Sequence, residues 1–361
     1  MKRFPRLQLH PGFTLIELLI AIAVSGIVLA GLVQVFTTTN RSYSQQDEMA
    51  TQQQNLRVAK MYLVRDIRMA GCGFGSAFFY LGTRIYPLDN TNAVPSSSTG
   101  PVDGSDILTI RYVNYSDPDS GTLPQLMPTN LAPSPSPTTF TVSTNSDISL
   151  WESGPHELPF LAVYTRPLSF GSTNLISDVF TVTGIDSVNR TLTCTGLRAD
   201  IPTNNISQSS TINFFSAAQL NTIRYELRFE ETPIDALNPK PMLYRTDNDG
   251  IMREIAENIE DLQFAFGLDS NGDGIVENKE WFGDGILDNP LWAGEQDLDD
   301  NQKTQIRLVR ISIMGKSSRQ LPGQKEIVRP DIEDHTVGTV PPEKYLRQLL
   351  QFEIKPRNLK G

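Results

Sequence analysis

The sequence is poor in the residues that enzymes most often use for catalysis. Of its 361 residues, only three are histidines and two are cysteines. No two histidines have metal-ligand spacing, and the chain contains neither a Gly-x-Ser-x-Gly turn for a serine nucleophile nor a glycine-rich phosphate loop. These absences argue against a hydrolase, including one tethered to a membrane, and we expect a protein that is not an enzyme. Isolated histidines such as His156 and His335 are then structural or solvated.

Positive charge is also scarce. The chain has 31 basic and 41 acidic residues, which gives a formal net charge of −10. An acidic surface repels polyanions, so nucleic acid and anionic lipid are not expected as partners bound through charge. The hydrophobic share of 39% is nevertheless enough for a sizeable core in a chain of this length.

One long apolar run stands near the N-terminus, from Phe13 to about Phe36. As a helix it would reach about 36 Å, enough to cross a hydrocarbon core of about 30 Å. A short basic leader precedes it, which predicts a cytoplasmic N-terminus. A secretory signal has a shorter apolar core, and a plain signal anchor leaves unexplained why Glu17 lies inside the run, where a carboxylate is costly.

The residues Gly12-Phe13-Thr14-Leu15-Ile16-Glu17 resemble the cleavage and methylation site of type IV prepilins. The resemblance implies that residues 1–12 are a leader, that a prepilin peptidase cuts after Gly12, and that the new amino terminus on Phe13 is methylated. Removal of the three leader cations would change the net charge from −10 to −13. Glu17 matches the family's characteristic acid, which is thought to meet the amine of a neighbouring subunit during assembly. Such a pair is cheaper to bury than either ion alone.

Residues 37–75 continue the helical pattern outside the membrane segment 13–36, now with polar residues. Apolar residues recur at steps of three and four from Leu56 to Ala70, which predicts a stripe that docks on a globular head. Glycines at 71, 73 and 75 are expected to end the helix. The stretch from Arg65 to Gly73 is similar to the end of this helix in the PilW type of minor pilin.

The remainder, 76–361, has mostly the alternating pattern of β-strands. The sequence therefore predicts an α+β fold, with a long N-terminal helix packed on one largely antiparallel head that carries insertions. Two segments rich in Ser, Thr, Pro and Gly, at 86–104 and 116–139, are expected to be surface loops. Strands are expected around residues 105–113, 160–164, 179–183, 191–195, 211–215, 223–229, 242–244, 263–267, 306–314 and 349–354.

The two cysteines, Cys72 and Cys194, fall in what would be a periplasmic head. An oxidising compartment allows a disulfide between them, which would tie the end of the helix to a strand. The alternative is a pair of buried thiols that act as small apolar residues.

One twelve-residue stretch, 269–280, has the spacing of a calcium-binding loop. Oxygen ligands would come from positions 1, 3, 5, 7, 9 and 12, and glycine occupies position 6. The predicted site holds one Ca²⁺, and its candidate ligands are Asp269, Asn271, Asp273, the Ile275 carbonyl, Glu277 and Glu280. Because the preceding residues have a strand pattern, we expect a lone loop and not a paired EF-hand domain. The alternative is an acidic turn in solvent.

The resemblance to PilW-type minor pilins, and to the related pseudopilin J, extends to the strands near 305–314 and 349–359. It implies a structural protein that helps to initiate, assemble or cap a type IV pilus. Its partners would be the prepilin peptidase, other minor and major pilins, and a host or surface ligand if the head is adhesive. The chain would lie in the inner membrane with a periplasmic head before assembly, and in the pilus or at the cell surface afterwards. The alternative within this class is a pseudopilin of a type II secretion system.

Overall fold

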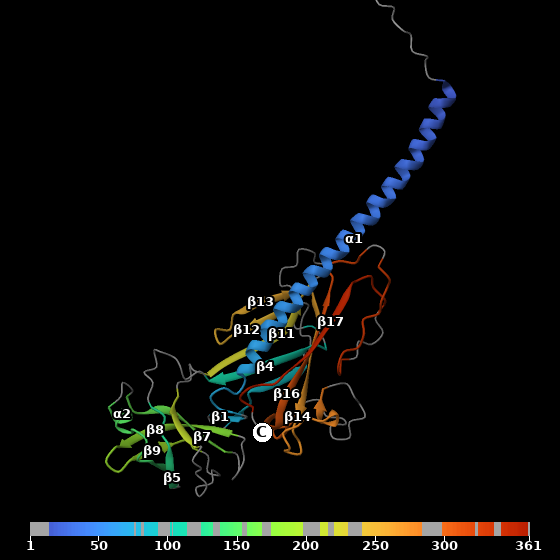
Figure 1. Cartoon of the computed structure of the whole chain (residues 1–361). Coiled ribbons are helices and arrows are strands. Elements are labelled where there is room, and N and C mark those ends of the chain that lie inside the picture. The colour runs from blue at the N-terminus through green and yellow to red at the C-terminus, as the bar shows by residue number, and fades with distance from the viewer. Residues whose placement is uncertain are drawn as a thin grey trace, which may run out of the picture.

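The computed structural model describes residues 14–75, 77–80, 83–92, 102, 104–113, 124–132, 138–153, 157–167, 175–197, 210–215, 220–229, 240–283, 298–321, 324–335 and 341–359. Within them, one long helix projects from a head made almost entirely of strands (Figure 1). Almost all strand pairs are antiparallel. The predicted α+β, pilin-like fold is therefore confirmed.

Helix α1 spans Leu15–Met69 and contains 55 residues, which corresponds to about 80 Å of length. It begins at Thr14, which caps the first turn. It ends just before Gly71, whose φ of 71° lies in the left-handed region that favours glycine. From Leu15 to Met69, the expected segments 13–36 and 37–75 thus form one continuous helix, and residues 70–75 are a turn.

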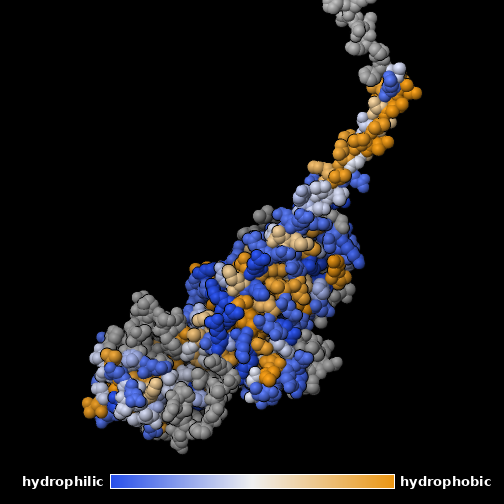
Figure 2. All heavy atoms as spheres, viewed as in Figure 1, coloured by the Kyte–Doolittle hydropathy of each residue, from blue (hydrophilic) through white to orange (hydrophobic). Residues whose placement is uncertain are grey.

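The two halves of α1 have different surroundings. Its N-terminal half is apolar and projects from the head, as Figure 2 shows by its orange band, and Leu15 is 78% exposed. It is long and apolar enough to cross a membrane. In the C-terminal half, the predicted stripe of Leu56, Ala59, Leu63 and Ile67 is fully buried against the head.

Two sheets pack with α1 around a single hydrophobic core. We call these two sheets together the helix-bound lobe. The five-stranded sheet has the order β13-β12-β11-β4-β3, and the four-stranded sheet has the order β15-β14-β16-β17. In the first, the strands are β3 (Leu88–Asn92), β4 (Asp106–Val113), β11 (Leu220–Phe229), β12 (Pro241–Thr246) and β13 (Met252–Glu257). In the second, they are β14 (Ile259–Leu268), β15 (Trp281–Phe282), β16 (Ile306–Lys316) and β17 (Arg347–Ile354).

A third sheet, of eight strands, has a separate hydrophobic core. Its main path β10-β7-β8-β9-β6-β5 lies between β4 and β11 in the sequence, and we call strands β5 to β10 with α2 the inserted lobe. In Figure 1 this lobe lies at the end of the head away from the projecting helix. Its strands are β5 (Pro128–Ala132), β6 (Thr138–Val142), β7 (Phe160–Pro167), β8 (Leu175–Asp186), β9 (Thr191–Thr195) and β10 (Thr211–Phe214).

Short elements complete the fold. Strand β1 (Ala77–Tyr80) pairs in parallel with β8 and in antiparallel with β2 (Thr83–Ile85), so the chain joins the third sheet directly after α1. Helix α2 is Ser149–Glu152, α3 is Gln302–Gln305, and a 3₁₀ turn covers Asn278–Glu280.

The ten expected strands are all present, but the two expected loop segments are partly wrong. Strand β3 lies in the segment 86–104, and β5 and the start of β6 lie in the segment 116–139. These strands have few apolar residues of their own. Leu88 in β3 is buried because neighbouring β4 supplies both the backbone hydrogen bonds and the core around it. Pairing therefore overrides local composition here.

Candidate functional site

The predicted assembly residue, Glu17, lies in the first turn of α1. Its Oε2 accepts hydrogen bonds from the backbone N–H and the hydroxyl of Thr14, both at 2.9 Å, and Thr14 Oγ1 accepts from the Glu17 N–H at 3.3 Å. This reciprocal capping box satisfies backbone donors at the helix start. Glu17 is therefore a helix-capping residue, a role that the sequence analysis missed although a threonine three residues before a glutamate is its ordinary signature. Gly12 and Phe13, the predicted cleavage site, lie outside the described residues.

Polar contacts join α1 to the upper end of the helix-bound lobe. The carboxylate of Glu48 accepts from the backbone N–H and the hydroxyl of Ser318, at 2.9 and 2.7 Å. One turn later, the buried Gln52 donates from Nε2 to the carbonyl of Gly315 at 2.5 Å and to that of Leu346 at 3.2 Å. These bonds satisfy strand-end carbonyls that would otherwise lie unpaired under the helix. The helix is thereby held in one position along the head.

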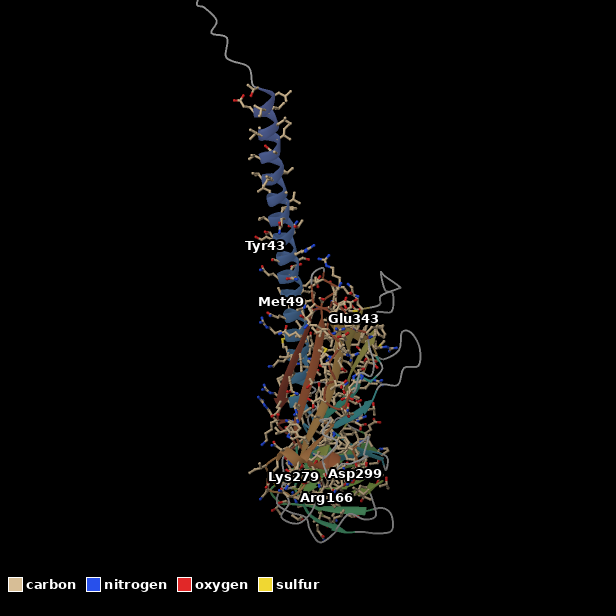
Figure 3. The ribbon with its side chains drawn as sticks, turned by 90° about the vertical axis from the view of Figure 1, so that its right-hand side faces the viewer. Tyr43, Met49, Arg166, Lys279, Asp299 and Glu343 are labelled. Atoms are coloured by element: carbon tan, nitrogen blue, oxygen red, sulfur yellow. The ribbon has the colours of Figure 1, made fainter. Side chains whose placement is uncertain are left out.

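The predicted calcium loop connects β14 to β15 and is closed by its own hydrogen bonds. Asp269 Oδ1 accepts from the Gly274 N–H at 3.2 Å, which folds position 6 back over position 1. Glu280 is fully buried, and its Oε1 and Oε2 accept from the backbone N–H groups of Ser270 and Glu277 at 3.2 and 2.9 Å. Burial acts to raise the pKa of Glu280, but these hydrogen bonds outweigh it and hold the pKa below its usual value. Figure 3 places Lys279, which belongs to this loop, at the end of the head away from Tyr43.

The remaining predicted ligands form turns along the loop. Asn271 Oδ1 accepts from the Asp273 N–H at 2.9 Å, and Asp273 Oδ1 accepts from the Ile275 N–H at 2.8 Å. Glu277 is ion-paired with Lys279 at 2.9 Å. Oxygen donors of this kind suit Ca²⁺. However, in the part of the chain that the structure describes, no three Asp, Glu, His or Cys side chains gather closely enough to hold a metal ion.

A buried arginine beside this loop was not predicted. Arg307, at the start of β16, has its Nε 3.4 Å from Asp269 Oδ2, and both side chains are almost completely buried. Its Nη1 donates to the carbonyls of Thr304 and Ile306, both at 3.1 Å. Burial lowers the pKa of Arg307, and the adjacent Asp269 carboxylate opposes that shift. The charge of position 1 is thus already balanced by the protein, and a cation at the loop would have to compete with the guanidinium.

No disulfide joins Cys72 to Cys194. Cys72 lies in the turn after α1, whereas Cys194 is on β9 and is fully buried in the core of the inserted lobe. Burial raises the pKa of the Cys194 thiol to about 12, because the thiolate would be poorly solvated there. The predicted bridge is therefore not formed, and Cys194 behaves as a small apolar residue.

His335, expected to be isolated, belongs to a buried polar cluster. Asp261 on β14 is fully buried, and its Oδ2 lies 2.7 Å from Arg329 Nη2 and 2.8 Å from His335 Nδ1. Gln263 donates from Nε2 to Asp261 Oδ1 at 2.7 Å. Burial acts to raise the pKa of Asp261, but the contacts with His335 and Arg329 outweigh it and lower the pKa. No spacing in the sequence signals this cluster, which binds the segment 324–335 to the four-stranded sheet. His156 lies outside the described residues.

Comparison with known families gives two matches. The prokaryotic N-terminal methylation motif matches residues 10–33, and the type IV pilus-assembly protein W family, PilW, matches residues 231–358. Neither the curated proteins nor the solved structures contain a match. The first match covers the predicted processing site and the start of α1. The second covers β12 to β17, including the loop 269–280.

The two matches agree with the geometry. The apolar helix and the methylation motif indicate a membrane-anchored chain, and the matched C-terminal region contains β13, β16 and β17, three of the strands against which α1 packs. Domains of the pilin family are typically structural and not enzymatic, and they associate with other pilins and with the pilus assembly machinery. The geometry and the two family matches together support a type IV minor pilin of the PilW type.

Proposed function

We propose that this minor pilin acts in the initiation or at the tip of a type IV pilus, after a prepilin peptidase has cut behind Gly12 and Phe13 has been methylated. One observation carries the proposal. The apolar half of α1 is exposed along its whole length, while the other half of the same helix is fixed to the head. Such a helix needs an apolar partner from outside the chain, first the bilayer and then the helices of neighbouring pilins.

The shape of the head supports a position at the tip. The inserted lobe adds bulk at the end of the head that lies away from the projecting helix (Figure 1). A subunit with such bulk is accommodated more easily at the end of a filament, where one side has no neighbour, than within its shaft. The same bulk supports a pilus more than a short secretion pseudopilus, and the experiment below separates the two.

The role proposed for Glu17 is to set the register of the incoming subunit. Within one chain its carboxylate is satisfied by Thr14. A carboxylate in a low-dielectric setting also attracts an amine strongly, and the methylated amine of a neighbour would supply that charge. Glu17 would then exchange a local cap for a contact between subunits when the filament forms.

Replacement of Glu17 by alanine tests this role in the bacterium that carries the chain. We expect normal cleavage, a methylated Phe13 by mass spectrometry, and a strong loss of surface pili by electron microscopy. Gln8→Ala, in the leader, is the control and should leave pili unchanged. Wild-type pilus numbers in Glu17→Ala would refute the register role. If deletion of the whole chain abolishes type II secretion and leaves pili intact, the protein is a pseudopilin instead.

The loop 269–280 is proposed to bind one Ca²⁺ in addition. The proposal is supported by the oxygen chemistry at positions 269, 271, 273 and 280 and by the contact between Gly274 and Asp269 that curls the loop. Asp269, Asn271, Asp273, the Ile275 carbonyl, Glu277 and Glu280 would hold the ion, which would supply only charge balance and rigidity. Because Arg307 already neutralises Asp269, the affinity should be low, in the range of about 10⁻⁴–10⁻³ M that extracellular calcium sites use.

A further inference from the structure

Two adjoining hollows beside α1 are rich in cations, although the chain as a whole is acidic. One, of about 610 Å³, lies between the end of α1, the loop 269–280 and the C-terminal segment, and the other, of about 580 Å³, follows the outer face of α1. They adjoin at Arg68 and Arg357, which line both, and we call the two hollows together the basic groove. Its exposed cations are Arg57, Lys60, Arg65, Arg68, Lys355 and Arg357.

Among the described residues, most of these cations have no acidic partner. Arg65 is paired with Asp66, and Lys60 lies 4.6 Å from the centre of the Phe352 ring. Among the residues that the structure describes, no ion pair is recorded for Arg57, Arg68, Lys355 or Arg357. Of the described residues that line the groove, Glu353 is the only acid.

This charge is not explained by the helix alone. Cations near the C-terminus of a helix are favoured by its dipole, but that effect is confined to the last turn, where Arg68 lies. Arg57 lies three turns earlier, and Lys355 and Arg357 belong to a different segment. In a chain with more acids than bases, such a concentration of unpaired cations favours an anionic partner.

The apolar residues that line the groove indicate which kind of anion it binds. Met61 and Met69, which are 59% and 40% exposed, lie among the cations together with Val64. Exposed methionines suit an adaptable contact with apolar side chains. A partner that offers both carboxylates and apolar groups is a polypeptide, whereas the overall negative charge of the chain disfavours a long nucleic acid.

The position of the groove argues against the membrane surface as its binding partner. Arg57 is separated from Phe36 by nearly six helical turns of α1, or about 30 Å. Attraction to lipid headgroups is screened within about 8 Å at physiological salt. A neighbouring pilin, in contrast, would stand alongside the same rod, since the apolar half of α1 continues directly into the half that carries the groove.

We propose that the basic groove binds an acidic amphipathic segment of a neighbouring pilin and so selects which subunit stands beside this one. The inference rests on the proposed role in pilus assembly and adds the chemistry of the partner to it. Complementary charge determines which partner binds and how fast it associates more than how tightly it is finally bound. The methionines would then exclude water from the centre of the contact.

Full-length protein in neutral detergent, titrated with a labelled synthetic helix that carries Glu and Leu on one face, tests the groove by fluorescence anisotropy. We expect saturable binding that weakens from 0.15 to 0.5 M NaCl, and at least about a tenfold loss in Arg57→Glu/Arg68→Glu, because attraction becomes repulsion. Lys355→Glu/Arg357→Glu, in the C-terminal segment, should lose as much. Arg41→Glu/Lys325→Glu changes the net charge equally at exposed sites outside the groove and should bind as the wild type does.

Several outcomes would overturn the proposal. They are no binding of the peptide, equal binding by all variants, or preferential binding of duplex DNA or of phosphatidylglycerol vesicles in place of the peptide. Circular dichroism melting confirms that the variants are folded, and the two groove variants provide independent readings. Pilus counts separate this inference from the proposed function. Normal pili in both groove variants, with pili lost in Glu17→Ala, would refute the groove and leave the assembly role intact.

Discussion

At the scale of single residues, Asp66 is the main polar contact between α1 and the five-stranded sheet. Its side chain is almost completely buried, and it accepts from Tyr225 Oη at 2.6 Å, from Arg245 Nε at 2.7 Å and from Arg65 Nε at 2.8 Å. Burial acts to raise the pKa of Asp66, but the bonds from Arg65, Tyr225 and Arg245 outweigh it and lower the pKa below its usual value. The carboxylate is therefore ionised and fixes the orientation of the helix around its own axis.

Replacing Asp66 with alanine should destabilise the head by about 3–5 kcal/mol, because a buried charge network loses its central partner. Arg65→Ala is the matched control and should cost at most about 1 kcal/mol, since Arg65 is the exposed partner of the same carboxylate. Urea unfolding at pH 7 measures both. Equal losses in the two variants would contradict a central role for Asp66.

The pH dependence of the same variant has a definite sign. A folded pKa below the unfolded value means that the Asp66 contribution is complete above about pH 4 and is lost as the pH falls through the folded pKa. The stability difference between wild type and Asp66→Ala should therefore shrink as the pH is lowered from about 5 to about 2.

At the scale of elements, α1 stops because the chain must reverse within a very small space. A Cβ on Gly71 would lie 2.5 Å from the carbonyl oxygen of Gly75 and 2.7 Å from Leu359 Cδ2, and the φ of 71° already disfavours any other residue. The Gly71 N–H donates to the Arg111 carbonyl at 3.0 Å, so the turn is also joined to β4. The end of the helix and the start of the head are thus one unit.

Gly71→Ala should lower the stability of the head by more than about 1–3 kcal/mol, because steric overlap adds to backbone strain. Gly250→Ala separates the two terms, since Gly250 has the same φ of 71° but a Cβ added there would meet nothing within 4 Å; it should cost only about 1 kcal/mol. Thermal melting of both variants provides the comparison. If Gly71→Ala is no worse than Gly250→Ala, the close approach is relaxed easily and does not define the turn.

At the scale of the whole molecule, calcium would act through the stability of the folded head. A ligand that binds only the native state raises its stability by mass action, so millimolar CaCl₂ should raise the melting temperature of residues 37–361 relative to EDTA. Asp273→Ala should remove that increase. Asn90→Ala, on β3 and away from the loop, is the control and should retain it. A melting temperature indifferent to calcium in the wild type would mean that the loop is only an acidic turn.

The sequence was informative where a pattern is local. The apolar run, the stripe from Leu56 to Ala70 and the alternating strands depend on spacing within one element, and the structure confirms them. Contacts between segments that are distant in the chain could not be predicted from the sequence. Arg307 approaches Asp269 across 38 positions, and His335 approaches Asp261 across 74. Nothing in the neighbourhood of either residue signals its partner, and β3 formed against its local composition for the same reason.

The sequence predicted one head that carries insertions, and it did not predict that the head is divided into two lobes. In the structure, Val113 at the end of β4 is paired with Leu220 at the start of β11. The two strands would form an ordinary hairpin if the inserted lobe were removed. The inserted lobe lies outside the matched region 231–358, so it is an addition to the part of the head that the PilW family describes.

That pairing has a consequence for the order in which the chain folds. Closing β4 onto β11 across roughly a hundred residues costs about 3 kcal/mol more entropy than closing a tight hairpin, and such long-range pairings are slow. The inserted lobe reduces this cost if it folds first. Leu126 and Ile212, near its two ends, exchange backbone hydrogen bonds at 2.9 and 2.8 Å, so a folded insertion already holds the two ends of the gap together. Since the inserted lobe also precedes β11 in the chain, we expect it to acquire structure before the sheet that carries it is complete.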